Sequence, residues 1–221
     1  TQGVSSAASD VYKRQGMFAL GMDAYIVAGL IPSISKSFNK SSSAIGQGVT
    51  VFTLFFSISA PIFSTILAKS PVKKILIIAI SVFTLANIIT AISMNYMLYI
   101  VSRAIAGLGA GVFSPIAISA SNHLVSEKNK GKAIAFTVGG MSVGTVIGVP
   151  LGLEIANISN WRFAMLVIIG ISFIALISIS ILMPKFKIET PPNLKDRFQL
   201  FLNKHVPVSY THLTLPTILL V

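Results

Sequence analysis

Charged side chains are rare inside the apolar stretches of this chain, and two of them could take part in proton chemistry. Asp23 lies in the apolar stretch that begins at Gly16, and Arg103 lies in the one that begins at Tyr96. A charge in an apolar environment is costly, so each needs a partner, water or a function. A carboxyl group in such a place can bind and release a proton, and a nearby guanidinium can favour its charged form. Asp23 and Arg103 are therefore our candidates for proton coupling.

Six apolar segments must position these residues. A helix needs about 20 apolar residues to cross a bilayer core of about 30 Å. Helices and closed barrels are the only folds that satisfy their backbone hydrogen bonds in lipid, and these segments do not alternate in polarity as barrel strands do. The sequence therefore predicts an all-α integral membrane protein with a six-helix bundle over residues 16–183. The expected spans are Gly16–Ile34, Ala44–Ala68, Ile75–Ser93, Tyr96–Leu124, Ala133–Ala156 and Phe163–Met183.

The helical rise gives an expected depth for each charged residue. At 1.5 Å per residue, Asp23 lies about 10 Å beyond Gly16, and Arg103 lies about as deep from the opposite face. Across a core of about 30 Å the two are then about 10 Å apart in depth. This separation implies a shared water-filled cavity, and it does not imply a direct ion pair. Glu154, the third ionisable residue of the spans, is expected at the outer interface.

The composition agrees with a chain that lies mostly in lipid. Of its 221 residues, 53% are hydrophobic and 10% are charged, and the mean hydropathy is +0.82. The chain has no cysteine, which excludes disulfides and thiolate metal sites, and we expect no cofactor. The net charge of +11 comes from short loops beside apolar spans, so it indicates membrane orientation and not nucleic-acid binding.

Lys and Arg concentrate on alternate loops, which sets the expected orientation. By the positive-inside rule the loops rich in these residues face the cytoplasm. Both ends of the chain are then cytoplasmic, in a multi-pass protein of the inner or plasma membrane. The residues expected on the cytoplasmic side include Lys69, Lys73, Lys74, Lys128, Lys130 and Lys132, and those expected outside are Lys36, Lys40 and Arg162.

Both ends of the chain differ in character from the bundle. The segments SSAASDVYKRQ and VSYTHLTLPT resemble translated sequencing adaptors, so residues 1–15 are expected to be a non-native or disordered tail and residues 208–221 a non-native tail. Between the bundle and the second tail, residues 184–207 read as a cytoplasmic linker with a short amphipathic helix. The alternative for this segment is a helix that packs on a missing half of the protein.

Small residues recur at helical spacing in two of the spans. Glycines every four residues leave one helix face without side chains, so another backbone can approach it closely. The fifth span carries the longer stripe, and Pro150 removes a backbone hydrogen bond within it. We expect a packing or conformational role for Gly107, Gly111, Gly140, Gly144, Gly148, Pro150 and Gly152.

Four sequence motifs resemble those of the major facilitator superfamily, and within it the bacterial drug:H+ antiporters with twelve spans. They are LGMDAYIVAGLIPSI at 20–34, RAIAGLGAG at 103–111, GGMSVGTVIGVPLG at 139–152 and NWR at 160–162. The second is similar to the pattern R-x-x-Q-G-x-G, with Ala106 in place of Gln. The third is similar to G-x-x-x-G-P-x-x-G, with Pro150 one residue late. The loop between the second and third spans departs from the family's acidic loop motif.

The resemblance implies the N-terminal half of a proton-coupled efflux carrier for drugs, sugars or nucleosides. Its partners would be a small-molecule substrate, protons, the lipid bilayer and a missing C-terminal six-helix half. Tyr25, Phe52, Phe55 and Phe56 could line an apolar substrate cavity, and Trp161 is expected as an aromatic anchor at the membrane interface.

Other functions remain open at this point. Uptake by a symporter is the main alternative within the carrier class. A channel or a structural membrane scaffold is the alternative from another class, because glycine-rich packing serves any helix bundle. A membrane-embedded hydrolase is disfavoured, because the spans offer neither paired carboxylates nor the motif H-E-x-x-H, and we expect no enzyme activity.

Overall fold

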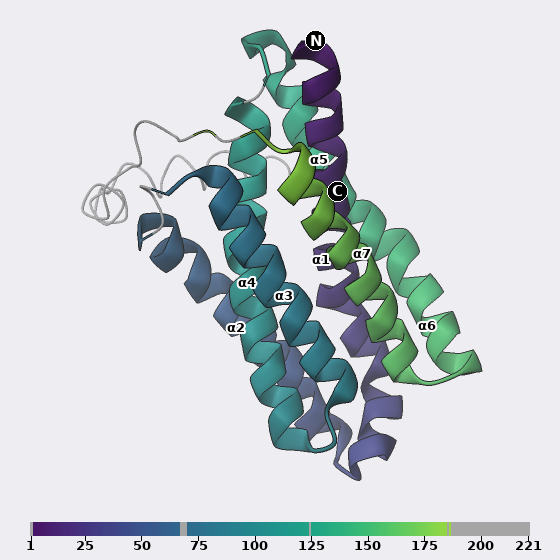
Figure 1. Cartoon of the computed structure of the whole chain (residues 1–221). Coiled ribbons are helices and arrows are strands. Elements are labelled where there is room, and N and C mark those ends of the chain that lie inside the picture. Colours follow the sequence, from purple (N-terminus) through teal and green to yellow (C-terminus); the bar gives the residue numbers. More distant parts are fainter. Residues whose placement is uncertain (1, 67–69, 124, 185, 187–221) are drawn as a thin grey trace, which may run out of the picture. The chain divides into compact units, whose positions relative to one another are not determined.

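The computed structural model describes residues 2–66, 70–123, 125–184 and 186, and in this part of the chain the long elements are helices (Figure 1). Six stretches are long and apolar enough to cross a membrane. The prediction of an all-α bundle with six spans is therefore confirmed. The helices are α1 (Gln2–Phe38), α2 (Ser42–Ile66), α3 (Val72–Ile92), α4 (Tyr96–His123), α5 (Lys130–Val143), α6 (Val149–Ile158) and α7 (Trp161–Leu182), with a 3-10 turn η1 (Glu127–Asn129) before α5 and a π-turn η2 (Gly144–Gly148) before α6.

The first helix begins much earlier than the sequence suggested. The structure is helical from Gln2, where a disordered tail over residues 1–15 was one of the expectations. Between Val4 and Gln15 the chain has neither glycine nor proline, and it contains the good helix formers Ala, Lys, Arg and Gln. The linker expected over residues 184–207 and the tail over residues 208–221 lie almost entirely outside the described residues.

The interior of the bundle is formed mainly by α1, α3 and α4. In each of these spans 56% of the most apolar window is buried, against 22–28% in α2, α7 and the continuous stretch from α5 to α6. In Figure 1, α4 lies between α2 and α3, and α7 packs beside α3. Helix α1 packs against α5 and α7. A residue on the inner face of α1 or α4 is therefore shielded by protein on several sides.

Buried hydroxyl pairs connect neighbouring helices. The Thr90 and Ser102 oxygens are 2.8 Å apart between α3 and α4, and those of Ser121 and Thr137 are 2.6 Å apart between α4 and α5. Thr84 of α3 donates to the Ser172 oxygen of α7 at 3.0 Å. Such bonds add about 0.6 kcal/mol each in a membrane, and they fix which helix faces meet.

Candidate functional site

Asp23 of α1 and Arg103 of α4 form a buried ion pair in the bundle interior. The Arg103 Nη1 atom donates to both carboxylate oxygens of Asp23, at 2.9 and 3.1 Å. Neither side chain is more than 1% exposed. Two opposite charges removed from solvent in this way stabilise each other strongly, and the loss of either one leaves the other without compensation.

The direct contact corrects the expectation that the two residues are about 10 Å apart in depth. The helix extends well beyond Gly16, because α1 runs from Gln2 to Phe38, so Gly16 is not a fixed starting point for the depth of Asp23. The long arginine side chain then covers the remaining distance. The expected separation was wrong because it took Gly16 as a fixed end of the helix and left out the length of the arginine side chain. The shared water-filled cavity stays a prediction.

The guanidinium of Arg103 has a second contact, with an aromatic ring. Its central carbon lies 4.5 Å from the centre of the Phe52 ring of α2, which is a cation–π contact. The Nε atom has no hydrogen-bond partner among the described residues. The carboxylate of Asp23 and the ring of Phe52 are thus the two groups that hold this cation.

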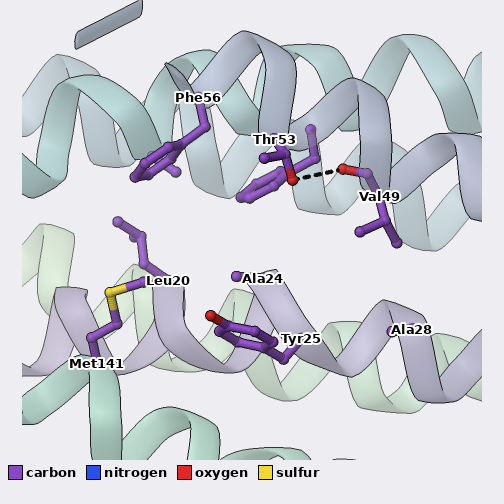
Figure 2. A pocket seen from close by; sticks show the side chains of 10 residues that line it. Leu20, Ala24, Tyr25, Ala28, Val49, Thr53, Phe56 and Met141 are labelled. Atoms are coloured by element: carbon purple, nitrogen blue, oxygen red, sulfur yellow. Dashed lines mark hydrogen bonds between the residues drawn. The ribbon is translucent and has the colours of Figure 1, made fainter. Parts of the chain in front are cut away.

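An apolar pocket of about 250 Å³ lies between α1 and α2, and Phe52 is one of the residues that line it. Figure 2 shows the residues of α1 facing those of α2 across the empty space, with Met141 of α5 at one side. The pocket is lined by Leu20, Ala24, Tyr25, Ala28, Val49, Phe52, Thr53, Phe56, Ala110 and Met141.

The sequence named three of these lining residues, namely Tyr25, Phe52 and Phe56, and their role in substrate binding stays a prediction. Phe55, the fourth aromatic candidate, is not among the described residues that line the pocket. Sequence reasoning missed the small and aliphatic part of the wall. A usable signal was present, because Leu20, Ala24 and Ala28 recur every four residues and so share one face of α1.

The wall of the pocket is almost entirely apolar. Tyr25 and Thr53 contribute its side-chain hydroxyl groups, and the Thr53 hydroxyl already donates to the carbonyl of Val49 at 2.9 Å. The rings of Phe52 and Phe56 are stacked, with centroids 6.2 Å apart and an interplanar angle of 24°. Such a wall suits an apolar or aromatic ligand.

The glycine stripes lie where helix backbones come closest. On α4, a methyl group at Gly107 or Gly111 would overlap the backbone carbonyl of Phe52 or Phe56. The fifth span meets α1 in the same way: Gly140 and Gly144 face backbone carbonyls, while Gly148 and Gly152 face the side chains of Met22 and Ile26. Pro150 is exposed and lies in the first turn of α6, directly after the π-turn. A conformational role for these residues stays a prediction.

The N-W-R segment ties three helices together at one end of the bundle. Asn160 caps α7 by accepting from the backbone N–H of Arg162, at 3.1 Å. The Trp161 indole donates to the Ser37 hydroxyl at 2.9 Å, and Trp161 is only 2% exposed, so it is a packed residue and not the interfacial anchor that we expected. The guanidinium of Arg162 donates to the carbonyls of Ala91 and Ser93 at the end of α3.

Comparison with known proteins places this architecture in a family. The chain matches the Major Facilitator Superfamily over residues 16–220. It is 29% identical over 86% of its length to the uncharacterized MFS-type transporter YbcL of Bacillus subtilis, and 24% identical over 87% to the putative transporter AraJ of Escherichia coli. In both cases the match covers 48% of the relative, so the chain spans about half the length of these curated relatives.

The fold agrees with that of a solved transporter. The proton:xylose symporter XylE, in complex with 6-bromo-6-deoxy-D-glucose, superposes with a TM-score of 0.75 at 16% identity. The match covers 84% of this chain and 46% of XylE. At this identity the likeness establishes the fold alone. On the family match and the six-span architecture together, the chain is a multi-pass membrane protein that belongs to the Major Facilitator Superfamily.

Proposed function

We propose that this chain is the N-terminal six-helix half of a proton-coupled carrier that exports small apolar compounds from the cell. The observation that carries the proposal is that Phe52 both lines an apolar pocket and contacts Arg103 of the Asp23–Arg103 ion pair. A group that can bind a proton, Asp23, is then linked to a space that can bind a substrate through two side chains, those of Arg103 and Phe52.

The net charge of the Asp23–Arg103 pair changes when Asp23 binds or releases a proton. With Asp23 ionised, the pair is neutral overall and closes the contact between α1 and α4. A proton on Asp23 removes the negative charge and leaves Arg103 without compensation, which favours a different arrangement of the two helices. Proton binding and helix movement are coupled in this way, as a secondary carrier requires.

The pocket favours an apolar substrate over a sugar or a nucleoside. A polyhydroxylated ligand loses hydrogen bonds to water on entering, and a wall with two hydroxyl groups, one already engaged, does not replace them. An apolar or aromatic compound has no such loss. The volume of about 250 Å³ is below the range of about 300–1,000 Å³ typical of drug-sized sites, so a second six-helix half would complete the cavity.

The half-length match to curated relatives supports a second half that faces this one across the substrate cavity. Carriers of this kind alternate access by rocking two bundles around a site near the membrane midplane. In the orientation that the positive loops favour, both ends of this chain lie in the cytoplasm, in the inner or plasma membrane. Hereafter, the full-length carrier means this chain followed by that second half.

Transport in proteoliposomes tests the proposal. The full-length carrier would be reconstituted with an imposed pH gradient, and the movement of the neutral dye N-phenyl-1-naphthylamine and of radiolabelled xylose would be followed. We expect the dye, and not xylose, to accumulate on the side from which protons flow. Accumulation in the direction of proton flow would instead establish a symporter, and flux that ignores the pH gradient would establish a channel.

A further inference from the structure

We propose that Phe52 transmits the occupancy of the pocket to the Asp23–Arg103 pair, and so acts as a positioning residue of the coupling mechanism. This inference rests on the proposed function and goes one step further. It assigns to one side chain the link between substrate binding and proton binding.

Phe52 borders the pocket and also contacts the guanidinium of Arg103. Phe52 lines the pocket together with Tyr25 and Phe56, and its ring lies 4.5 Å from the guanidinium carbon of Arg103. It is 4% exposed, so the cation–π contact is shielded from solvent. A desolvated contact of this kind is stronger than an exposed one. A ligand that touches the ring therefore touches a group that helps to hold Arg103.

The backbone at Phe52 is held in place, so that the response of the ring is confined to its side chain. Gly107 of α4 lies directly against the carbonyl of Phe52, and Gly111 lies against that of Phe56 one turn later. Close backbone contact at two successive turns leaves α2 little freedom to shift relative to α4. The side chains of Phe52 and Phe56, by contrast, border empty space.

Arg103 depends on the ring because Asp23 is its one hydrogen-bond partner among the described residues. Its Nη1 atom binds Asp23, and its Nε atom has no hydrogen-bond partner among the described residues. A substrate that packs on the pocket side of Phe52 holds the ring against the guanidinium and keeps Arg103 against Asp23. The occupied pocket thereby disfavours a proton on Asp23. In the empty pocket the ring is free to turn, Arg103 is held less firmly, and a proton binds more easily.

This linkage predicts that the substrate binds more tightly as pH rises, because proton and substrate oppose each other. The groups that could contribute to the pH dependence lie on several elements. Tyr99 of α4 is within electrostatic reach of both members of the pair. Helix α2 has no Asp, Glu, Lys, Arg, His or Tyr. Among the residues whose side chains the structure describes, the other ionisable residues of the helices around the pair are Lys13, Arg14, Tyr25 and Lys36 of α1, Lys73 and Lys74 of α3, Tyr96 and His123 of α4, Lys130 and Lys132 of α5, Glu154 of α6 and Arg162 of α7.

The test compares two neighbouring aromatic residues in the full-length carrier. Binding of tritiated N-phenyl-1-naphthylamine in nanodiscs, with empty nanodiscs subtracted, gives the Kd at about pH 6 and about pH 8, and the ratio of the two Kd values measures the linkage. Phe52→Leu removes the ring that faces Arg103 and should reduce the ratio about fivefold or more, toward one. The matched control Phe56→Leu should weaken binding at both pH values by a similar factor and leave the ratio unchanged.

Two further variants guard against a purely structural effect. Phe52→Tyr keeps an aromatic face over the guanidinium and should keep the wild-type ratio, whereas Phe52→Met should behave like Phe52→Leu. An unchanged ratio in Phe52→Leu and Phe52→Met, or an equal loss in Phe56→Leu, would overturn the role of Phe52 and leave the proposed function intact. A wild-type ratio of one would instead remove proton coupling, and with it the proposed function.

Discussion

Gly144 of the π-turn lies directly against the backbone carbonyl of Phe18 in α1, and a methyl group on this glycine would overlap that oxygen. Gly140 lies in the same way against the carbonyl of Arg14, one turn earlier on both helices. Small residues let helix backbones approach closely in a membrane. The contact between α1 and the fifth span therefore depends on the absence of side chains at these positions.

The first prediction follows from that contact. Gly144→Ala should force the two backbones apart and lower the stability of the full-length carrier by about 1–3 kcal/mol. Gly139 is a matched control, because a methyl group there would meet nothing within 4 Å. The measurement is the fraction of monodisperse protein that remains after heating in detergent. Ala favours a helix more than Gly does, so helix propensity cannot cause a loss at either position. Equal losses from Gly144→Ala and Gly139→Ala would therefore show that the close contact at Gly144 is not responsible.

Gly148 allows a test of movement rather than of stability. A methyl group there would lie 3.1 Å from the Cβ and Cγ atoms of Met22, which needs a shift of only a few tenths of an ångström, so Gly148→Ala should be tolerated. The Gly148→Leu variant should insert into the membrane normally. Its larger side chain should nevertheless block the rocking of the helices, so that transport is lost. Normal transport by Gly148→Leu would place this glycine at a contact that does not change during the cycle.

The ion pair gives a prediction that a double-mutant cycle can check. Asp23→Asn leaves the buried Arg103 charge uncompensated and should cost about 3–5 kcal/mol, and Arg103→Gln should have a similar cost. The double variant should be more stable than the sum of the two losses predicts, by about 1 kcal/mol or more. Chemical denaturation of the full-length carrier in detergent measures the free energy of unfolding of the two single variants and of the double variant. Simple additivity would mean that the pair contributes nothing as a pair.

Asp23→Asn also tests proton coupling. In proteoliposomes we expect this variant to lose transport of N-phenyl-1-naphthylamine against its gradient and to retain passive exchange of the dye, because Asn cannot take up a proton. Glu154→Gln is the control, since Glu154 is exposed and lies on α6, which carries neither member of the pair. If Asp23→Asn still concentrates the dye with unchanged pH dependence, the coupling group lies elsewhere in the carrier.

The orientation of the bundle can be checked by labelling. The chain has no cysteine of its own, so single cysteines can be introduced without background in this half. Ser42→Cys, at the start of α2, should react with an impermeant maleimide added outside the cell, and Ser70→Cys, just before α3, should react only after permeabilisation. Reaction of both from outside would contradict the six-helix arrangement.

The number of helices could be predicted from the sequence because it depends on the lengths of apolar segments, which single-sequence hydropathy measures directly. The contact between Asp23 and Arg103 could not be predicted from the sequence, because it depends on where α1 begins and on how far a side chain reaches. The residues that the glycines contact could not be predicted either. Spacing showed that Gly144 and Gly107 lie on bare helix faces, and only the three-dimensional arrangement shows that those faces meet α1 and α2.

The π-turn at Gly144–Gly148 has a consequence for the phase of the fifth span. Four residues of an α-helix advance by about 400°, so a stripe of every fourth residue rotates by about 40° at each step. A π-turn contains more residues per turn, and it therefore rotates the next stretch backward and cancels part of this drift. Each glycine of the stripe contacts a residue of α1, and both members of the pair advance by four residues at each step. The pairs are Gly140 with Arg14, Gly144 with Phe18, Gly148 with Met22 and Gly152 with Ile26. The widened turn thus keeps two parallel helices aligned over a length at which a straight α-helix would lose its glycine face.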